Sequence, residues 1–198
     1  MRKNYWTKLP ISVFLIIFSF NAYAVKCNEE SPNHKLEGDK YFDIEEASSL
    51  TRQQKDKISK FFSRFINERM EGDSTQIECI GPERIAKKIT KNEVIESARI
   101  SQQSDGKLIV KLELFSEVKN ATHSETLRYF GYNNQYLINN ISDDNLVISY
   151  KLRRPGGAGV IFIEALIDMT IKNKKLTITE TRYIGGYFAV QLIRELYL

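Results

Sequence analysis

Two cysteines, Cys27 and Cys79, are the first residues of this 198-residue chain that could do chemistry. They stand roughly 50 residues apart and form no C-x-x-C motif, so their spacing is not that of a redox-active dithiol. A single pair of cysteines in an exported chain predicts one structural disulfide. In the chain-entropy model, closing a loop of this length stabilises the fold by about 4 kcal/mol.

The remaining side chains offer little for catalysis. The chain has only two histidines, His34 in a polar stretch and His123 in the segment KNATHSET, which is typical of a hairpin loop. No serine stands in the G-x-S-x-G motif of a nucleophile elbow. Zinc-ligand spacing, a phosphate-binding P-loop and a dinucleotide-binding glycine motif do not occur. We therefore predict a protein that is not an enzyme and that uses no catalytic residue, cofactor or metal.

The string RRPGGAG, residues 153–159, combines two arginines with a glycine-rich loop. Such a loop could hold an anion on its backbone N–H groups. A phosphate cradle normally leads into a helix, whose N-terminus adds to the attraction, whereas a strand pattern follows here. An exposed hairpin loop is the favoured interpretation, and Arg153 and Arg154 remain candidate ligand-binding residues.

A second candidate lies in the predicted hairpin over residues 160–183. With Asn173-Lys174 as its two-residue turn, Ile167 would face Glu180 and Ala165 would face Arg182. Two interpretations stay open. Glu180 and Arg182 form an ion pair at the edge of the core, or they lie among apolar walls as the fixed polar groups of a ligand pocket. We take Glu180, Arg182 and the adjacent Tyr183 as candidate ligand-binding residues.

The opposite face of this hairpin carries Glu164 and Asp168. A carboxylate hydrolase needs two acids about 5 Å or about 6.5–9.5 Å apart. Four residues along a strand separate the two Cα atoms by roughly 13 Å. This pair is therefore a poor catalytic dyad, and a small secreted hydrolase is an alternative with little support.

The N-terminus predicts export. A basic start, an apolar run over residues 9–20 and an A-x-A site at Ala22 and Ala24 describe a secretory signal peptide over residues 1–24. The apolar run is too short to span a bilayer, so no stable membrane anchor is expected after cleavage. Lys26 precedes Cys27, which disfavours lipidation. We expect the periplasm, with secretion as the alternative, for a single domain over residues 25–198 with an extended arm over 25–49.

The formal charge of +4 is partly a property of the leader. Removing three of the 29 basic residues leaves 26 against 25 acidic residues, close to neutrality. A nucleic-acid partner is therefore not expected. A membrane-surface or anion binder that uses the basic face of the first helix remains an alternative.

Hydrophobic spacing indicates a mixed fold. Thr51 and Gln54 fit a capping box for a helix over residues 50–72, with a stripe from Ile58 to Met70 and a stop at Gly72. A short second helix is expected over 81–90, and a helix is favoured over a strand for 185–198. Period-two segments predict strands near 94–101, 108–115, 125–132, 135–141, 146–154, 159–171 and 175–183, with a short strand near 41–44 in the arm.

The sum of these features predicts an α+β fold, in which two N-terminal helices pack on a curved antiparallel sheet of six to seven strands with a possible C-terminal helix. The function expected from it is that of an exported binding protein. Its sheet face or pocket would hold a protein partner or a small apolar ligand, and its oligomeric state is left open.

Overall fold

The computed structural model describes one helix and nine strands. It covers residues 27–31, 50–80, 85–102, 108–118, 121–130, 135–156 and 159–198. The predicted leader, the strand near 41–44 and most of the arm lie outside these residues. The elements are α2 (Arg52–Ser63), β1 (Met70–Ile80), β2 (Ile85–Gln102), β3 (Leu108–Val118), β4 (Ala121–Tyr129), β5 (Gln135–Ile141), β6 (Asn145–Gly156), β7 (Gly159–Lys172), β8 (Lys175–Ile184) and β9 (Tyr187–Tyr197).

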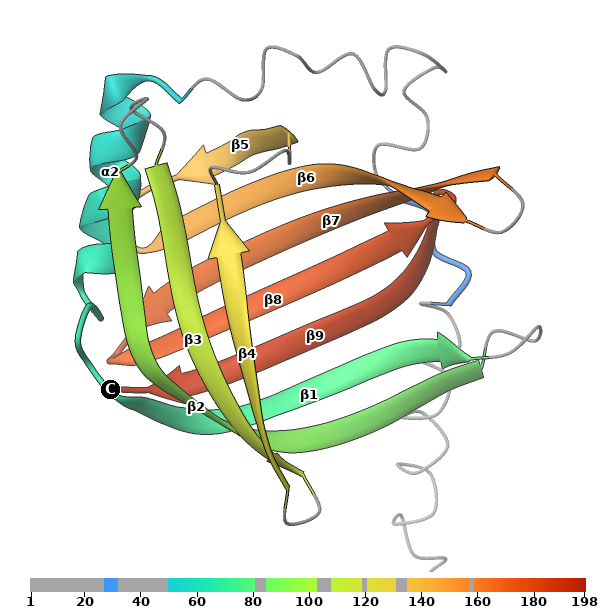
Figure 1. Ribbon diagram of the computed structural model, residues 1–198, viewed down its shortest axis with the longest axis horizontal. Coiled ribbons are helices and arrows are strands. Elements are labelled where there is room, and N and C mark those ends of the chain that lie inside the picture. The colour runs from blue at the N-terminus through green and yellow to red at the C-terminus, as the bar shows by residue number, and fades with distance from the viewer. Residues whose placement is uncertain are drawn as a thin grey trace, which may run out of the picture.

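All nine strands form one antiparallel sheet in the order β4-β3-β2-β1-β9-β8-β7-β6-β5. The order consists of two meanders, one over β1 to β4 and one over β5 to β9, joined where β1 pairs with β9. The sheet is strongly curled into a half-barrel, and α2 closes one end of it (Figure 1). The predicted sheet-dominated α+β fold is confirmed in this coarse form.

The start of α2 follows the predicted capping box. The backbone N–H of Gln54 donates to Thr51 Oγ1 at 3.2 Å, and that of Thr51 donates to Gln54 Oε1 at 2.9 Å. The predicted end at Gly72 is wrong, because α2 ends at Ser63 and Asn67 adopts a left-handed φ of 66°. Asparagine tolerates that conformation, which a helix interior does not allow.

Gly72 belongs to β1 and is required for another reason. A Cβ atom at this position would collide with the backbone carbonyl oxygen of Glu195 on β9. The close approach of β1 and β9, rather than a helix end, explains the glycine.

The core lies between α2 and the concave face of the sheet. Ile58, Phe61, Phe62 and Phe65 are buried, and the three phenylalanine rings meet edge to face with centroids 5.3–6.3 Å apart. Alternate strand residues complete the cluster, as period two requires. These residues include Met70, Ile95, Leu112, Leu146, Ile148, Ile167, Met169, Leu176, Ile178 and Leu196.

The two further predicted helices are wrong. Residues 85–90 begin β2, and residues 187–197 form β9, while 81–84 lie outside the described residues. The seven strands predicted between residues 94 and 183 are all present, and two unpredicted strands, β1 and β9, raise the number in the described sheet to nine. The apolar spacing of Phe188, Leu192 and Leu196 misled the assignment, because an interval of four fits a strand of period two as well as a helix.

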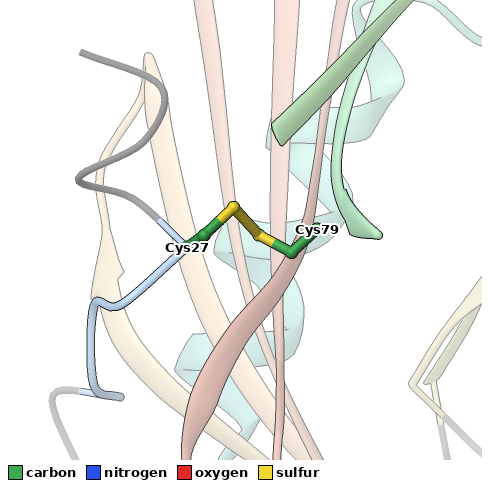
Figure 2. The surroundings of a disulfide bond; sticks show 2 residues. All are labelled: Cys27 and Cys79. Carbon is green, nitrogen blue, oxygen red and sulfur yellow. A yellow bond between two sulfur atoms is a disulfide. The ribbon is translucent and has the colours of Figure 1, made fainter. Parts of the chain in front are cut away.

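The predicted disulfide between Cys27 and Cys79 is confirmed, with the two Cα atoms 5.7 Å apart (Figure 2). It fastens the segment 27–31 to β1. The same segment bonds to the β8–β9 hairpin, since Phe188 N donates to Glu29 O at 2.8 Å and Ser31 N donates to Gly186 O at 2.7 Å. The part of the arm that is described is therefore ordered by covalent and hydrogen bonds together.

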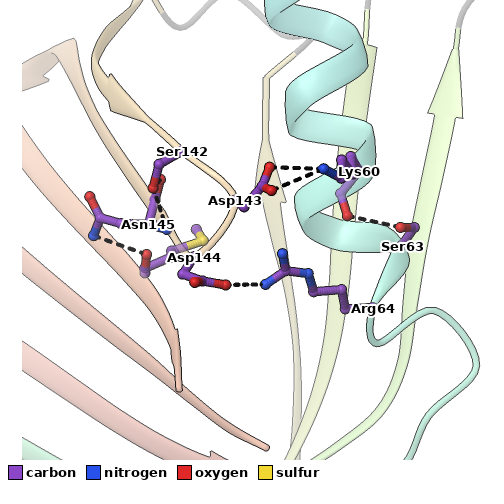
Figure 3. A network of polar contacts seen from close by, with 8 residues as sticks. Lys60, Ser63, Arg64, Ser142, Asp143, Asp144 and Asn145 are labelled. Atoms are coloured by element: carbon purple, nitrogen blue, oxygen red, sulfur yellow. Dashed lines mark hydrogen bonds and ion pairs between the residues drawn. The ribbon is translucent and has the colours of Figure 1, made fainter. Parts of the chain in front are cut away.

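Surface ion pairs fasten α2 to the β5–β6 turn. Lys60 Nζ lies 3.0 Å from Asp143, and Arg64 Nη1 lies 2.6 Å from Asp144 (Figure 3). The basic face of the helix thus meets acidic partners within the chain.

Candidate functional site

The hairpin of β7 and β8 has the predicted register. Asn173 and Lys174 form its turn with φ values of 52° and 62°, as expected for a type I′ turn. Ile167 pairs with Glu180, and Ala165 pairs with Arg182. This register places Glu180 and Arg182 on the concave face of the sheet.

Glu180 and Arg182 form an ion pair beside an aromatic hydroxyl. Arg182 Nε donates to Glu180 Oε1 at 2.6 Å, and the Tyr150 hydroxyl donates to the same oxygen at 3.3 Å. The Glu180 side chain is 4% exposed and that of Arg182 is 43% exposed. Burial lowers the pKa of the Arg182 guanidinium, but Glu180, Tyr150 and Glu125 together outweigh burial and raise this pKa above its usual value.

Tyr183 does not join this pair. It points to the outer face, where it is buried and packs edge to face on Phe188 at 6.3 Å. Burial and the carboxylates of Glu29 and Glu164 raise the pKa of the Tyr183 phenol. Its place beside the disulfide-bound segment indicates a structural contact.

Arg153 and Arg154 lie near the end of β6, where they pair with Phe162 and Ile161. The backbone places them in a strand, and their side chains lie outside the described residues.

Glu164 and Asp168 are kept apart by their surroundings. Glu164 is buried and accepts a hydrogen bond from the Ser31 hydroxyl. Asp168 is exposed and accepts from Asn145 Nδ2 at 2.7 Å. The face that carries both acids is therefore solvated at Asp168 but not at Glu164, where the segment 27–31 covers it.

The most deeply buried charged side chain among the described residues, Arg194, was not predicted from the sequence. Arg194 on β9 points into the concave face and donates from Nε to Glu93 Oε2 at 2.7 Å. The two side chains are 1% and 7% exposed. Their residues lie 101 positions apart, so no local pattern joins them. The alternation of Leu192, Arg194 and Leu196 would have been visible if this segment had been treated as a strand.

A second carboxylate reaches Arg194 from an edge strand of the sheet. Glu125 Oε2, on the edge strand β4, lies 3.7 Å from Arg194 Nη2, and its charge also acts on Arg182. We call Glu93, Glu125, Glu180, Arg182 and Arg194 the charged layer. It ends the apolar core on the side away from α2.

Two buried polar atoms beside this layer have no hydrogen-bond partner among the described residues, Arg194 Nη1 and Ser74 Oγ. Ser74 and Arg194 are direct partners in the β1–β9 ladder, so their side chains share the concave face. Buried polar groups normally find a partner. These atoms therefore mark a place that can receive a hydrogen-bonding group.

The concave face continues beyond the charged layer. Ile89, Val190 and Leu192 are half-buried, and the register puts them on the same face as Glu180 and Arg182. The same register places polar residues among them, namely Gln76, Glu78, Lys87 and Lys91. This arrangement of apolar surface next to fixed polar groups resembles the lining of ligand sites.

A separate cavity of about 510 Å³ lies where β1 to β4 bend. It shares Glu93 with the charged layer. Its lining includes Arg69 and five carboxylates, namely Glu71, Asp73, Glu93, Glu96 and Glu117. Among the described residues, no group of three or more acidic, histidine or cysteine side chains has the geometry of a metal site.

Comparison with known proteins leaves the function open. The chain matches no protein-family model and no curated protein. Among solved structures it is similar to the tesB protein of Mycobacterium avium subs paratuberculosis, with 8% identity and a TM-score of 0.21. The similarity covers 75% of this chain and 86% of the other. A score this low carries no argument about fold or function.

Proposed function

We propose that this chain is an exported, non-catalytic binding protein that holds a small apolar ligand on the open part of its concave face. The observation that carries the proposal is the half-buried apolar surface of Ile89, Val190 and Leu192 next to the charged layer. Apolar contact would supply most of the binding free energy, and the polar groups would orient the ligand.

Export is supported by the leader-like N-terminus and by the disulfide, since such bonds persist in oxidising compartments. In the described part of the chain, no helix has the length and hydrophobicity needed to span a membrane.

The alternatives have less support. A protein partner is the other occupant expected for the sheet face or pocket. If such a partner extended to the β4 edge, it would meet Glu125 and Arg128, exposed charges of the kind that protect edges from pairing. For a carboxylate hydrolase, the acid pair that the sequence offers on one strand face is Glu164 and Asp168, and Glu164 is buried against Ser31. A membrane-surface binder would use the helix face on which Lys60 and Arg64 are already paired.

The test uses a neutral fluorescent probe, N-phenyl-1-naphthylamine, titrated into the purified chain with its disulfide intact. We expect saturable fluorescence enhancement. Leu192→Asp should weaken binding about tenfold, because a carboxylate then lies in the apolar surface. Ile193→Asp is the matched control, because Ile193 is also half-buried but faces the other side of β9. Absence of saturable binding, or equal loss in both variants, would overturn the proposal.

A further inference from the structure

The contacts that Arg194 makes with the described residues use only part of its guanidinium. A guanidinium carries five N–H donors in a planar fork. Its Nε bonds to Glu93 at 2.7 Å, whereas Nη1 has no hydrogen-bond partner among the described residues. Nη2 has Glu125 as an ion-pair partner at 3.7 Å, a separation too long for a hydrogen bond. The edge formed by Nη1 and Nη2 is therefore the part of this buried cation that can donate hydrogen bonds to a new partner.

The chemistry of that edge selects an acceptor with two oxygens. Two parallel N–H donors match the geometry of a carboxylate, which arginine binds in a bidentate manner. Ser74 Oγ, also buried and without a hydrogen-bond partner in the described segments, lies across the β1–β9 ladder and could donate to one of the same oxygens.

The chain itself places a carboxylate near this edge. Glu125 belongs to an edge strand, and its side chain is 61% exposed. A long contact made by an exposed side chain contributes little. Glu125 can therefore turn into solvent without loss of core packing. Its departure leaves two arginines and two glutamates in the charged layer.

We propose that Arg194 is the head-group receptor of the concave face, and that the ligand is an amphiphile whose carboxylate displaces Glu125 and binds Arg194 Nη1 and Nη2 while its chain lies on Val190 and Leu192. This inference rests on the proposed function and adds the ligand class to it. Glu93 acts as a positioning residue, since it holds the guanidinium from the Nε side.

The experiment compares four probes with one twelve-carbon chain, namely dodecanoate, methyl dodecanoate, dodecanol and dodecyltrimethylammonium, by isothermal titration calorimetry below their micelle concentrations. Dodecanoate should bind about tenfold more tightly than the ester and the alcohol, and the cationic probe should bind most weakly. If a water molecule occupies this place on Arg194 and Ser74 instead, dodecanoate should bind no more tightly than the ester and the alcohol, and that result would contradict the proposal.

Variants locate the head group. Glu125→Gln removes the competing carboxylate and should raise dodecanoate affinity about three- to tenfold, with no change for dodecanol. Ser74→Ala should lower dodecanoate affinity about threefold. Glu117→Gln is the matched control, because this exposed glutamate lies on the neighbouring strand β3 and faces the other side. Arg194→Gln is secondary, since the loss of a buried cation can prevent folding.

The outcomes separate the two proposals. Equal affinity for dodecanoate and dodecanol, or no gain in Glu125→Gln, overturns the carboxylate receptor and leaves the apolar binding surface intact. If neither the four probes nor N-phenyl-1-naphthylamine binds, the proposed function is wrong as well.

Discussion

Three ion pairs of this protein join similar groups in very different surroundings. Arg194 and Glu93 are 1% and 7% exposed, Arg182 and Glu180 are 43% and 4% exposed, and Lys60 and Asp143 are 64% and 67% exposed. Their closest N–O distances range only from 2.6 to 3.0 Å. Distance therefore does not distinguish these pairs, whereas burial does.

The difference shows what each pair contributes. A buried charge that loses its partner keeps its desolvation cost. The pair of Arg194 and Glu93, here called the inner pair, therefore fixes the position of Arg194 without necessarily adding net stability. Breaking an exposed pair lowers the stability of the protein only slightly, because water replaces the lost partner. The pair of Arg182 and Glu180, here called the intermediate pair, has one buried carboxylate and one cation that can reach solvent.

The largest expected effect comes from Glu93→Gln. It leaves Arg194 buried without a full counter-charge, and we expect the free energy of unfolding to fall by about 3–5 kcal/mol. Urea denaturation followed by circular dichroism measures the change.

The matched control for Glu93→Gln replaces both partners, with Arg194→Met and Glu93→Leu together. Removal of both charges should return stability to within about 1 kcal/mol of the native chain. If the single variant is as stable as the native chain, the inner pair does not differ from the surface pair.

Glu180→Gln should have an intermediate effect. Arg182 can turn toward solvent, and the amide oxygen still accepts from Tyr150, so the expected loss is about 1–2 kcal/mol. The same urea experiment measures it. A loss in stability as large as that of Glu93→Gln would show that partial exposure of the cation does not reduce the cost of removing its partner.

The sequence contained enough information for the intermediate pair and too little for the inner one. Asn173-Lys174 and the alternation of β7 and β8 define a hairpin locally, so the register that joins Glu180 and Arg182 could be predicted. Arg194 and Glu93 belong to different meanders, and only the pairing of β1 with β9 brings them together. Nothing in one sequence states that long-range pairing.

The same limit explains the errors in the fold. Ile85 and Ile89 fit a short helix as well as alternate positions of a strand, and the neighbours on either side decide between the two. Met70 likewise fits the apolar stripe of α2, yet it is the first residue of β1. Met70 is buried although the element was misassigned, whereas Ile85 is exposed and Ile89 is only half-buried. At the start of β2, the apolar spacing therefore predicted neither the element nor the burial.

Lys60→Gln should leave stability at neutral pH and moderate salt unchanged within the error of a urea titration. Both side chains of the pair with Asp143 are mostly exposed, and water screens their attraction. Lys57→Gln, on the same helix, is the control. A clear loss specific to Lys60→Gln would mean that the link between α2 and the β5–β6 turn is more than a surface contact.

The smallest effect is a shift in one titration. The hydrogen bonds and the charge of Lys60 lower the pKa of Asp143 from its usual 3.8. Because the folded-state pKa lies below the unfolded value, the contribution to stability is present above about pH 3.8 and disappears as pH falls through the folded-state pKa. Carboxyl-detected NMR should find the Asp143 midpoint below 3.8 in the native chain and closer to 3.8 in Lys60→Gln. Identical midpoints in the two proteins would show that the contact between Lys60 and Asp143 is not maintained in solution. The most exposed of the three compared pairs would then not be an ion pair.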